Sequence, residues 1–424
     1  MITSDSRNSP STAILKTATN HKVTRQVEKR KQRLAFDHMD LEPEILQTIT
    51  DAGYERPTPV QAGLIPLAIE GNDLIGQART GTGKTAAFVI PILQTLEPKN
   101  RPLHPQALVL VPTRELAGQV LEEFLKLGGK QKIKCVPIYG GKPMRPQVNR
   151  LQEGVDVVVG TPGRVLDHLK RGTMNASRLE FLVLDEADRM LDIGFRPDIE
   201  RIMKCCPRER QTLLLSATLP DPILQIAKRY MNRPKLINFS TKSLAAETIE
   251  QSYFSVAEKN KYELLLALVK REKPQQAIVF CRTKLGTQRL YRKMLKDIPD
   301  QRVETIHGDM PQNKRDRVMK GFRAAEVKFL VATDVVGRGI DVSDISHIIN
   351  FDIPQLSDDY VHRVGRTGRM GKQGVAFTLV TPMEKSQLAA IEKRIDRKLT
   401  LDTIEGIESI SLKSTPKRRY RRAL

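Results

Sequence analysis

Residues 76–88, GQARTGTGKTAAF, decide the fold class of this chain. They follow a short apolar run at 73–75 (DLI) and lead into an apolar stretch at 86–93 (AAFVIPIL) that we expect to be a helix. Glycines between a strand and a helix let backbone N–H groups approach phosphate oxygens, and the helix N-terminus adds a favourable dipole. The pattern Ala78-x-x-x-x-Gly83-Lys84-Thr85 has Ala for the usual first Gly. It predicts that Lys84 reaches the outer phosphates of a nucleotide and that the Thr85 hydroxyl holds Mg²⁺.

Short, continuous apolar runs alternate with helical patterns along the rest of the chain. The first half contains ALVLVP (107–112), VDVVVG (155–160), FLVLD (181–185) and TLLLSA (212–217), and the second half contains AIVFC (277–281), KFLVAT (328–333) and HIINF (347–351). Runs that do not alternate with polar residues indicate strands buried on both faces, hence parallel sheets covered by helices. The sequence therefore predicts an α/β, doubly wound arrangement.

The two halves also resemble each other. A strand, a Thr/Arg turn and an amphipathic helix occur at both 108–126 and 277–295, and VVVGTPGR (157–164) resembles FLVATDVVGR (329–338). The paired threonines, Thr113 with Thr283 and Thr161 with Thr333, lie 170 and 172 positions apart. This pattern favours two related domains, 34–240 and 248–405, with a linker at 241–247. The alternative is that two unrelated α/β domains share such patterns by chance.

A length of 424 residues also suggests more than one domain. More than half of the formal net charge of +21 lies in two tails, 1–33 and 411–424, which carry +6 each. Their low apolar content predicts a disordered basic N-terminal extension at 1–33 and a basic C-terminal tail over 406–424. Basic tails mostly contact polyanions, of which nucleic acid is the commonest. A merely solubilising role is the alternative.

Other features favour a cytoplasmic protein. No apolar run approaches the roughly 20 residues that a membrane span needs. The first residues, MITSDSRNSP, lack the apolar core of a secretory signal. The four cysteines form no CxxC pair or His-rich spacing, which argues against a zinc site or a disulfide framework and favours a reducing compartment.

Three acids follow a predicted strand at 181–191, FLVLDEADRML. Carboxylates this close repel one another unless a cation lies among them. Beside a phosphate-binding loop, Asp185 is expected to hold Mg²⁺ and Glu186 to polarise the attacking water. Asp188 is expected to pair with SAT (216–218) or with a distant Arg rather than with the metal.

Residues 185–188 spell D-E-A-D, and the chain resembles the DEAD-box ATP-dependent RNA helicases of helicase superfamily 2 over about residues 34 to 400. The motifs that carry this resemblance are GYERPTPVQ (53–61), ARTGTGKT (78–85), PTREL (112–116), GG (140–141), TPGR (161–164), DEAD (185–188), SAT (216–218), IVFCRT (278–283), TDVVGRGID (333–341) and HRVGRTGR (362–369). They occur in the order of the family. The resemblance implies two tandem RecA-like domains, each a mostly parallel sheet flanked by helices.

The resemblance also implies a nucleotide site that binds ATP and Mg²⁺. In it Gln61 reads the adenine edge, Tyr54 stacks on the base, and Phe36 either supports this motif or is an ordinary core residue. The nucleotide-binding residues are Tyr54, Arg56, Gln61, Ala78, Arg79, Thr80, Gly81, Thr82, Gly83, Lys84, Thr85, Asp185, Gly339 and Asp341, with Thr85 and Asp185 on the metal. The catalytic residues are Lys84, Glu186 and the arginine fingers Arg366 and Arg369. Coupling between the domains is assigned to Asp188, Ser216, Thr218, His362 and Arg363.

An RNA surface is expected where strand ends meet helix starts. It comprises Pro112, Thr113, Arg114, Gly141, Thr161, Gly163, Arg164, Arg282, Gln312, Arg315 and Thr333. Hydroxyls, guanidinium groups and helix N-termini there suit phosphate oxygens and carry little sequence information. The chain has no Trp and only 5% aromatic residues, so base-stacking platforms are scarce and salt is expected to weaken binding strongly. The preference for RNA over DNA rests on the resemblance.

The function that follows is an RNA-stimulated ATPase that couples ATP binding and hydrolysis to local RNA duplex unwinding or ribonucleoprotein remodelling. A monomer with ribonucleoprotein partners is expected. The alternatives are a DNA-directed helicase of the same superfamily and an RNA clamp that hardly hydrolyses ATP. Intact Lys84, Glu186, Arg366 and Arg369 argue against the clamp. Val336 and Gly337 stand where the family often has smaller Ala or Ser residues.

Overall fold

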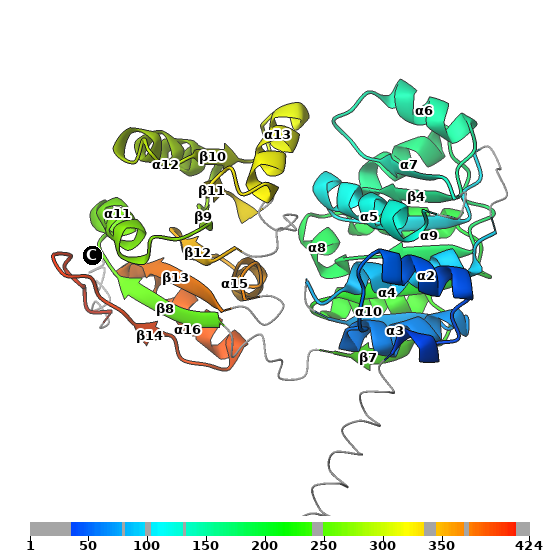
Figure 1. Cartoon of the computed structure of the whole chain (residues 1–424), viewed down its shortest axis with the longest axis horizontal. Helices are drawn as coiled ribbons and strands as arrows, with labels where there is room; N and C mark the ends of the chain where they lie inside the picture. Colours follow the sequence, from blue (N-terminus) through cyan, green and yellow to red (C-terminus); the bar gives the residue numbers. More distant parts are fainter. Residues whose placement is uncertain are drawn as a thin grey trace, which may run out of the picture.

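The computed structural model describes residues 35–78, 81–97, 103–129, 133–239, 249–334, 345–368 and 373–412. These residues form two lobes that stand side by side (Figure 1), the first ending at residue 239 and the second beginning at residue 249. The predicted N-terminal extension (1–33), the linker (241–247) and residues 413–424 of the predicted tail lie outside the described residues.

The first domain is a seven-stranded sheet with helices on both faces. Its elements are η1(Phe36–His38), α2(Pro43–Asp51), α3(Pro59–Ile69), β1(Leu74–Gln77), α4(Lys84–Thr95), β2(Ala107–Leu110), α5(Arg114–Leu127), β3(Cys135–Ile138), α6(Met144–Gln152), β4(Val157–Gly160), α7(Pro162–Lys170), β5(Phe181–Leu184), α8(Ala187–Asp192), α9(Arg196–Cys205), β6(Gln211–Ser216), α10(Asp221–Tyr230) and β7(Lys235–Asn238). The strand order is β3-β4-β2-β5-β6-β1-β7. All neighbouring strands are parallel.

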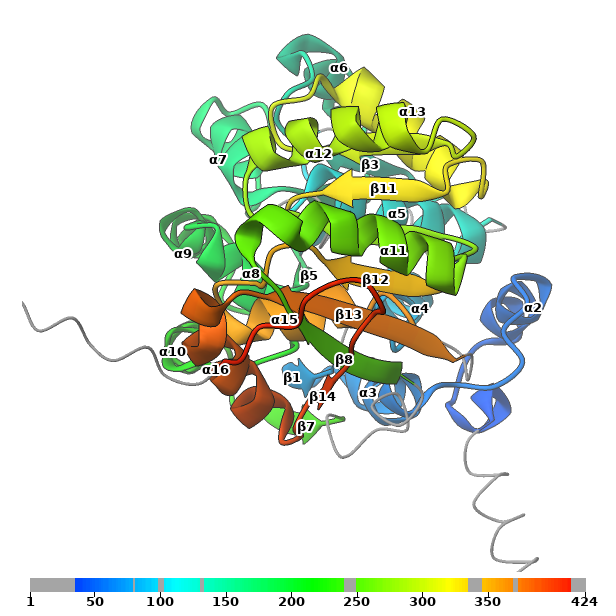
Figure 2. The ribbon, with the colours of Figure 1, turned by 90° about the vertical axis from the view of Figure 1, so that its left-hand side faces the viewer.

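The second domain is also a seven-stranded sheet. Its elements are β8(Ile249–Ser255), η3(Glu258–Asn260), α11(Lys261–Glu272), β9(Ala277–Phe280), α12(Lys284–Asp297), β10(Val303–Ile306), α13(Gln312–Arg323), β11(Phe329–Ala332), β12(His347–Asn350), α15(Ser357–Val364), β13(Gly374–Val380), η4(Pro382–Glu384), α16(Lys385–Ile395) and β14(Thr400–Leu401). The order is β10-β11-β9-β12-β13-β8-β14, again with parallel neighbours. Figure 2 shows this domain from outside, with α11 and α12 in front of its sheet.

The two sheets share one topology, so the duplication expected from the sequence is present in the fold. Counting strands along each domain, the first through the seventh occupy the same places in both sheets. Thr113 after β2 and Thr283 after β9 both cap a helix, accepting from the backbone N–H groups of Leu116 and Gly286. Thr161 and Thr333 likewise follow the equivalent strands β4 and β11.

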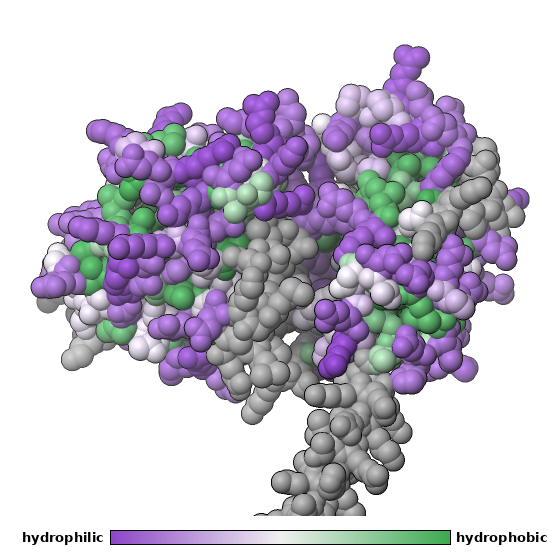
Figure 3. All heavy atoms as spheres, in the orientation of Figure 1, coloured by the Kyte–Doolittle hydropathy of each residue, from purple (hydrophilic) through white to green (hydrophobic). Residues whose placement is uncertain are grey.

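Each sheet is buried on both faces because alternate residues of the strands point into two cores. In the first domain, Val109 joins a core with α2 to α5, while Leu108 and Leu110 join a second core with α7 to α10. The second domain repeats this with a core facing α13, α15 and α16 and another facing α11 and α12. Hydrophilic residues dominate the visible outer face of both lobes (Figure 3). The α/β prediction of two tandem, parallel-sheet domains is therefore confirmed.

The second domain extends past residue 405. After β14, the backbone N–H of Ile410 donates to the carbonyl of Ser255 at 3.1 Å, and Ile404, Ile407 and Leu412 pack against the cores. Residues 406–412, which the sequence analysis assigned to the basic tail, thus lie along β8 as part of this domain. The apolar residues at 404, 407, 410 and 412 are the signal in the sequence for this packing.

Candidate nucleotide and RNA sites

The phosphate-binding loop lies between β1 and α4, as the sequence predicts. Gly81 and Gly83 have φ angles of +76° and +86°, which side chains other than glycine rarely adopt. Gly83 caps α4, so the first backbone N–H groups of the helix point toward the loop. With no phosphate present, Lys84 Nζ donates to the Ala78 carbonyl at 3.0 Å inside the loop. The loop therefore holds its lysine at the helix N-terminus, where a phosphate chain would replace the carbonyl as its partner.

Asp185 ends β5 beside Lys84. Burial raises the pKa of Asp185 to about 6, against the opposing pull of Lys84. One of its oxygens accepts from the Glu186 backbone N–H at 2.9 Å. Glu186 itself has φ +50°, a left-handed conformation that costs energy for a residue with a side chain. This turn separates the directions of two adjacent carboxylates at the end of one strand.

Glu186 has a buried cationic neighbour that the sequence analysis did not anticipate. Arg189, one turn along α8 and only 1% exposed, places Nη1 3.4 Å from Glu186 Oε2. The pair lies within the first domain and is almost sealed from water. Arg189 therefore holds the Glu186 carboxylate in place.

Asp188 is tied to the SAT segment. Its Oδ2 accepts from the backbone N–H and the hydroxyl of Thr218 at 2.8 and 3.0 Å, and its own N–H donates to Ser216 Oγ at 3.2 Å. Burial opposes the charged form, but His362 of the second domain, Lys84 and Thr218 outweigh it and lower the pKa of Asp188. Asp188 thus faces a cationic group across the domain boundary, and of the two partners weighed from the sequence it takes SAT.

The adenine-reading motif is connected to the phosphate loop. Gln61 and Thr58 form a capping box at the start of α3, in which Gln61 Oε1 accepts from the Thr58 N–H at 2.8 Å. Gln61 Nε2 donates to the Gly83 carbonyl at 3.1 Å. An amide oxygen accepts two hydrogen bonds and an amide nitrogen donates two, so each atom keeps one position for a base.

Tyr54 belongs to the same sequence motif and has its own partners. Its hydroxyl donates to Glu123 of α5, and Lys126 Nζ lies 4.8 Å from the ring centroid. Phe36 meets the ring edge-to-face, with centroids 6.4 Å apart, and is itself part of the core. Both interpretations of Phe36 therefore hold at once. Arg56 lies exposed on the same loop.

The second domain brings α15 to this site. His362 interacts electrostatically with Asp188 across the boundary, and Arg366 follows α15 with Nε donating to the His362 carbonyl at 3.3 Å. Five predicted nucleotide-site residues, Arg79, Thr80, Gly339, Asp341 and Arg369, lie outside the described residues, as do Val336 and Gly337. Their roles stay predictions.

Arg363 differs from its neighbours. It is 1% exposed and forms a bidentate pair with Asp334 at 2.6 and 2.8 Å, and its Nη1 donates to Asn350 Oδ1 and to the Asp352 carbonyl. Its guanidinium also lies 4.9 Å from the centroid of the Phe280 ring. All these partners belong to the second domain. The side chain therefore organises that domain from within, whereas the sequence analysis grouped it with the residues that couple the two domains.

The RNA candidates of the two domains touch one another. Arg114 Nη1 at the start of α5 donates to Gln312 Oε1 at the start of α13, at 3.0 Å. Beside this contact Arg315 Nη2 and Glu115 Oε1 lie 2.5 Å apart, with both side chains at least nine-tenths buried. A weaker, exposed pair, Arg323 with Glu122 at 3.9 Å, lies further along the same two helices. The predicted RNA surface is therefore assembled from both domains.

A glycine makes room for Arg114 in this surface. A Cβ at Gly141, whose φ is +76°, would stand 2.0 Å from Arg114 Nη1. Arg164 of α7 donates to the Lys142 carbonyl at 3.0 Å, which holds the same loop from its other side. Thr161 and Gly163 lie at the N-terminus of α7 beside it. A side chain at 141 would be strained by the positive φ and would displace the Arg114 guanidinium.

Three other residues predicted to bind RNA are buried or already paired with another side chain. Pro112 is buried behind Thr113, so its ring does not face solvent. Arg282 is paired with Glu384 of η4. Thr333 is buried, and its hydroxyl has no hydrogen-bond partner among the described residues. A buried hydroxyl without a partner is costly, so Thr333 has capacity for a ligand atom.

Comparison with known proteins follows the same division of the chain. Residues 58–226 match the family model of the DEAD/DEAH box helicases, and residues 260–371 match that of the helicase conserved C-terminal domain. The DEAD-box ATP-dependent RNA helicase CshA of Geobacillus kaustophilus is 47% identical over 384 residues, which are 89% of this chain and 81% of that protein. The protein of the same name from Bacillus subtilis is 43% identical over 89% of this chain and 77% of its own length.

The chain belongs to the DEAD-box ATP-dependent RNA helicases.

Solved structures of this family can be compared with the arrangement of the two domains in this helicase. Saccharomyces cerevisiae Dbp5 bound to RNA and ADP BeF3 matches this helicase with a TM-score of 0.79 at 34% identity, over 87% of this chain and 95% of that one. A DEAD box protein from Methanococcus jannaschii is more similar in sequence, at 41% identity over 87% and 99%, yet has a TM-score of 0.53. Because a TM-score over both domains falls when their mutual placement differs, the helicase has its domains placed as in the RNA-bound Dbp5 structure.

The described residues of this helicase contain neither a membrane-spanning helix nor a cluster of metal ligands. None of the helices there combines the length and apolar character needed to cross a bilayer. Nor do three or more His, Cys, Asp or Glu side chains gather there in a group that could hold a metal ion. A metal at Asp185 would therefore take its other ligands from Thr85, the nucleotide and water.

The residues that sequence reasoning missed are mostly acidic partners of predicted cations. Glu115 pairs with Arg315, Glu384 with Arg282, and Asp334 with Arg363. For Glu115 and Asp334 a signal was present, since each lies inside a quoted motif of this helicase, PTREL or TDVVGRGID. Glu384 had none, because it meets Arg282 from more than a hundred residues along the chain.

Proposed function

We propose that this DEAD-box helicase separates short RNA duplexes locally, by closing its two domains around ATP and a single RNA strand. The observation that carries this proposal is the direct contact between Arg114 of the first domain and Gln312 of the second. Residues suited to the RNA backbone meet only when the domains are together. The electrostatic interaction between Asp188 and His362 crosses the same boundary. Closure therefore completes both sites in one movement.

The nucleotide site supplies the chemistry. Lys84 exchanges the Ala78 carbonyl for the outer phosphates of ATP, and Gln61 uses its remaining donor and acceptor on the adenine edge. Glu186, fixed by its left-handed turn and by Arg189, accepts a proton from the attacking water. Arg366 and Arg369 are proposed to stabilise the charge that develops on the transferred phosphate.

Thr85 and Asp185 fit Mg²⁺. The pair offers a hydroxyl and a carboxylate that is 2% exposed, and burial raises the pKa of Asp185, an effect that a bound cation would oppose. Hard oxygen ligands are what Mg²⁺ prefers, and it keeps waters and phosphate oxygens as further ligands. When bound, the ion neutralises charge on the phosphates during their transfer.

The RNA surface supports binding through the backbone. Arg114, Arg164 and Gln312 offer guanidinium and amide groups, and the hydroxyl of Thr333 lacks a partner among the described residues, whereas Arg315 is buried against Glu115. Phosphate contacts of this kind position a strand without reading its sequence. Binding is therefore proposed to tolerate sequence and to weaken as salt rises. Release of phosphate reopens the domains and frees the strand, so unwinding is local rather than processive.

We further propose that the protein acts in the cytoplasm as a monomer, with ribonucleoprotein complexes as its targets. All four cysteines are free thiols, and burial raises the pKa of Cys206 to about 12, which keeps it unreactive. Cell fractionation tests the location. Sedimentation at several protein concentrations tests the monomer, because a self-associating chain would sediment faster as its concentration rises.

Phosphate release from ATP tests the function directly. It would be measured without nucleic acid, with single-stranded RNA, and with DNA of the same sequence. We expect stimulation by RNA alone. Equal stimulation by DNA would instead support a DNA-directed helicase. RNA binding with no stimulation of hydrolysis would support an RNA clamp.

A further inference from the structure

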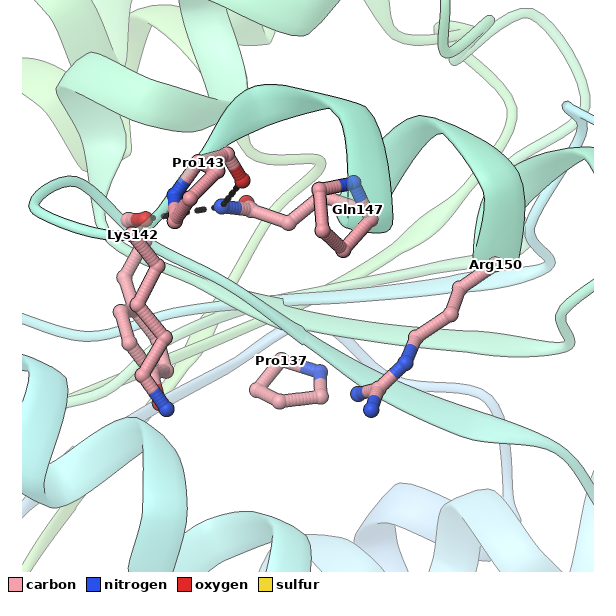
Figure 4. Close-up of a pocket in the computed structure, with 7 residues that line it drawn as sticks. Pro137, Lys142, Pro143, Gln147 and Arg150 are labelled. Carbon is pink, nitrogen blue, oxygen red and sulfur yellow. Dashed lines mark hydrogen bonds between the residues drawn. The ribbon is translucent and has the colours of Figure 1, made fainter.

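A cavity of about 130 Å³ lies outside the sites described above, between β3 and the start of α6. We call it the β3–α6 pocket. Its walls are Pro137, Tyr139, Pro143 and Pro146, with Gln147 above and the cationic side chains of Lys142 and Arg150 at its two sides (Figure 4). Three of these residues are rigid rings of proline and one is aromatic. The pocket thus offers flat apolar surfaces between two positive charges.

The pocket is held in shape by its own hydrogen bonds. Gln147 is buried, and its Nε2 donates to the carbonyls of Tyr139 and Pro143, both at 3.2 Å. These bonds fix the loop between β3 and α6 at its two ends. Because prolines lose little conformational freedom on binding, a ligand meets a preformed site.

The same loop belongs to the RNA surface. Residues 140 and 141 follow Tyr139, and Gly141 leaves room for the Arg114 guanidinium. The Lys142 carbonyl accepts from Arg164. One side of this loop therefore faces the two arginines assigned to the RNA backbone, and the residues on either side of its glycines line the pocket.

The ring of Tyr139 can take a stacking partner. It is half-buried, and Lys142 Nζ lies 5.3 Å from its centroid, so a cation already rests on its face. A nucleobase can stack its flat π-surface on the same face of the ring. The phosphates on either side of that nucleotide would then carry negative charge toward Lys142 and Arg150, which are both exposed. In the proposed function, RNA is the polyanion that Arg114 and Arg164 bind beside the loop. Its next base is held near the pocket at high effective concentration.

We propose that the β3–α6 pocket binds one unstacked nucleobase of the RNA strand, next to the segment whose backbone the first domain holds. The inference rests on the proposed function, since it needs RNA at Arg114 and Arg164. The base lies between Tyr139 and the prolines, and its flanking phosphates pair with Lys142 and Arg150. This subsite adds base contacts to an otherwise backbone-directed surface and fixes where the strand leaves the protein.

A series of RNA oligonucleotides tests the proposal. Each carries one abasic site, at a different position, and its dissociation constant is measured with a non-hydrolysable ATP analogue present. We expect one position at which loss of the base weakens binding about tenfold, a typical effect for one stacked base. In Tyr139→Leu, which keeps an apolar side chain but removes the ring, the abasic site at that position should have no further effect.

Two more variants separate stacking from charge. Lys142→Ala combined with Arg150→Ala alters only exposed side chains, so folding is not at risk, and we expect weaker binding of all RNAs and a shallower salt dependence. Arg145→Ala is the matched control, an exposed arginine of α6 that does not line the pocket, and it should keep the abasic effect.

The proposal is overturned if every abasic position binds alike, or if the abasic effect is as large in Tyr139→Leu as in the parent. Either result would leave the pocket open to another ligand, such as an acidic peptide. RNA-stimulated phosphate release is measured in the same samples. If it persists while the abasic series is flat, the helicase function stands and only the base subsite fails.

Discussion

Adjacent acids at the end of β5 show how position in the backbone assigns roles to like residues. Asp185 ends the strand facing Lys84, Glu186 turns through a left-handed conformation toward Arg189, and Asp188 bonds Thr218. Each carboxylate has a different partner within four positions of sequence. The three acids thus differ in their surroundings: Arg189 pairs with Glu186, Thr218 bonds Asp188, and at Asp185 burial outweighs the pull of Lys84.

Glu186→Gln is expected to abolish most ATP hydrolysis while ATP and RNA still bind. Removing a positioned general base costs about 10²–10⁴-fold in rate, and the amide keeps the shape of the side chain. Single-turnover phosphate release and separate binding measurements check this. Glu209→Gln, at an exposed position of the same domain, is the control and should retain the parent rate. Hydrolysis by Glu186→Gln at the parent rate would remove the assignment.

Asp185 predicts a dependence on pH. Its pKa is raised from 3.8 to about 6 in the folded protein. The native state therefore holds this proton more tightly than the unfolded chain, so the contribution of Asp185 makes the ligand-free protein less stable as pH rises from about 4 to about 6. Mg²⁺ needs the charged carboxylate, so Mg²⁺-dependent ATP affinity should rise over the same window.

Asp185→Asn removes this titration. We expect the ligand-free variant to be more stable than the parent at pH 7, by about 1–3 kcal/mol, and to lose the Mg²⁺ dependence of ATP binding. Thermal unfolding at pH 5 and pH 7 with and without Mg²⁺ and ATP measures both effects. Asp300→Asn, an exposed residue, is the control and should change neither. A variant less stable than the parent at pH 7 would contradict the account.

At the scale of elements, α15 does two tasks at once. His362 faces the first domain, while Arg363, the next residue, anchors the helix to β12 and to Asp334. One face of the helix therefore lies toward the first domain, and the other lies toward the core of the second domain. The resemblance assigned Arg363 to coupling between the domains, but this arginine already pairs with Asp334 of its own domain.

Arg363→Met is expected to destabilise the second domain by about 1–3 kcal/mol, because it leaves the buried Asn350 amide and the partly buried Asp334 carboxylate without their partner. Chemical denaturation followed by a probe in the second domain measures the loss. Arg394→Ala breaks an exposed pair with Asp358 on the neighbouring helix and should cost at most about 1 kcal/mol. Equal losses in the two variants would show that burial of Arg363 does not matter.

Elements were predictable to the extent that their signals were local. The seven quoted apolar runs correspond to β2, β4, β5, β6, β9, β11 and β12, all of which lie inside their sheets. Strands such as β3 (CVPI) and β10 (VETI) went unrecognised because edge position mixes proline and polar residues into them. The segment at 406–412 was not recognised as part of the second domain because it packs alongside β8, which is distant in the sequence.

Side-chain partnerships were less predictable. The described residues of the nucleotide loop, Ala78 and 81–85, lie between the end of β1 and the start of α4, an arrangement that a local pattern can predict. The pairs of Arg114 with Gln312 and of Arg282 with Glu384 join residues about two hundred and one hundred positions apart. Such pairs depend on how elements and domains pack, which no local pattern encodes.

At the scale of the whole molecule, a buried ion pair is among the contacts that join the two domains. Glu115 and Arg315 are 5% and 9% exposed, and their contact exists only while the domains are closed. Glu115→Gln is expected to reduce the factor by which ATP tightens RNA binding by about tenfold or more, because Arg315 is then buried without its carboxylate in the closed state. The affinity of the variant for ATP in the absence of RNA should change little.

Glu122→Gln is the matched control for this interface. It lies on the same helix, 3.9 Å from Arg323, but is 69% exposed, so water screens the pair. The coupling factor should stay near that of the parent. If both variants behaved alike, closure would not depend on the buried pair.

The central claim is that one closure completes the ATP site and the RNA site together. Its most direct test is the dissociation constant for single-stranded RNA, measured with and without a non-hydrolysable ATP analogue, and the constant for the analogue with and without RNA. Linkage requires both ratios to be the same. We predict that each ligand tightens the other by at least about tenfold. Two ligands that bind with unchanged affinity in each other's presence would contradict the account.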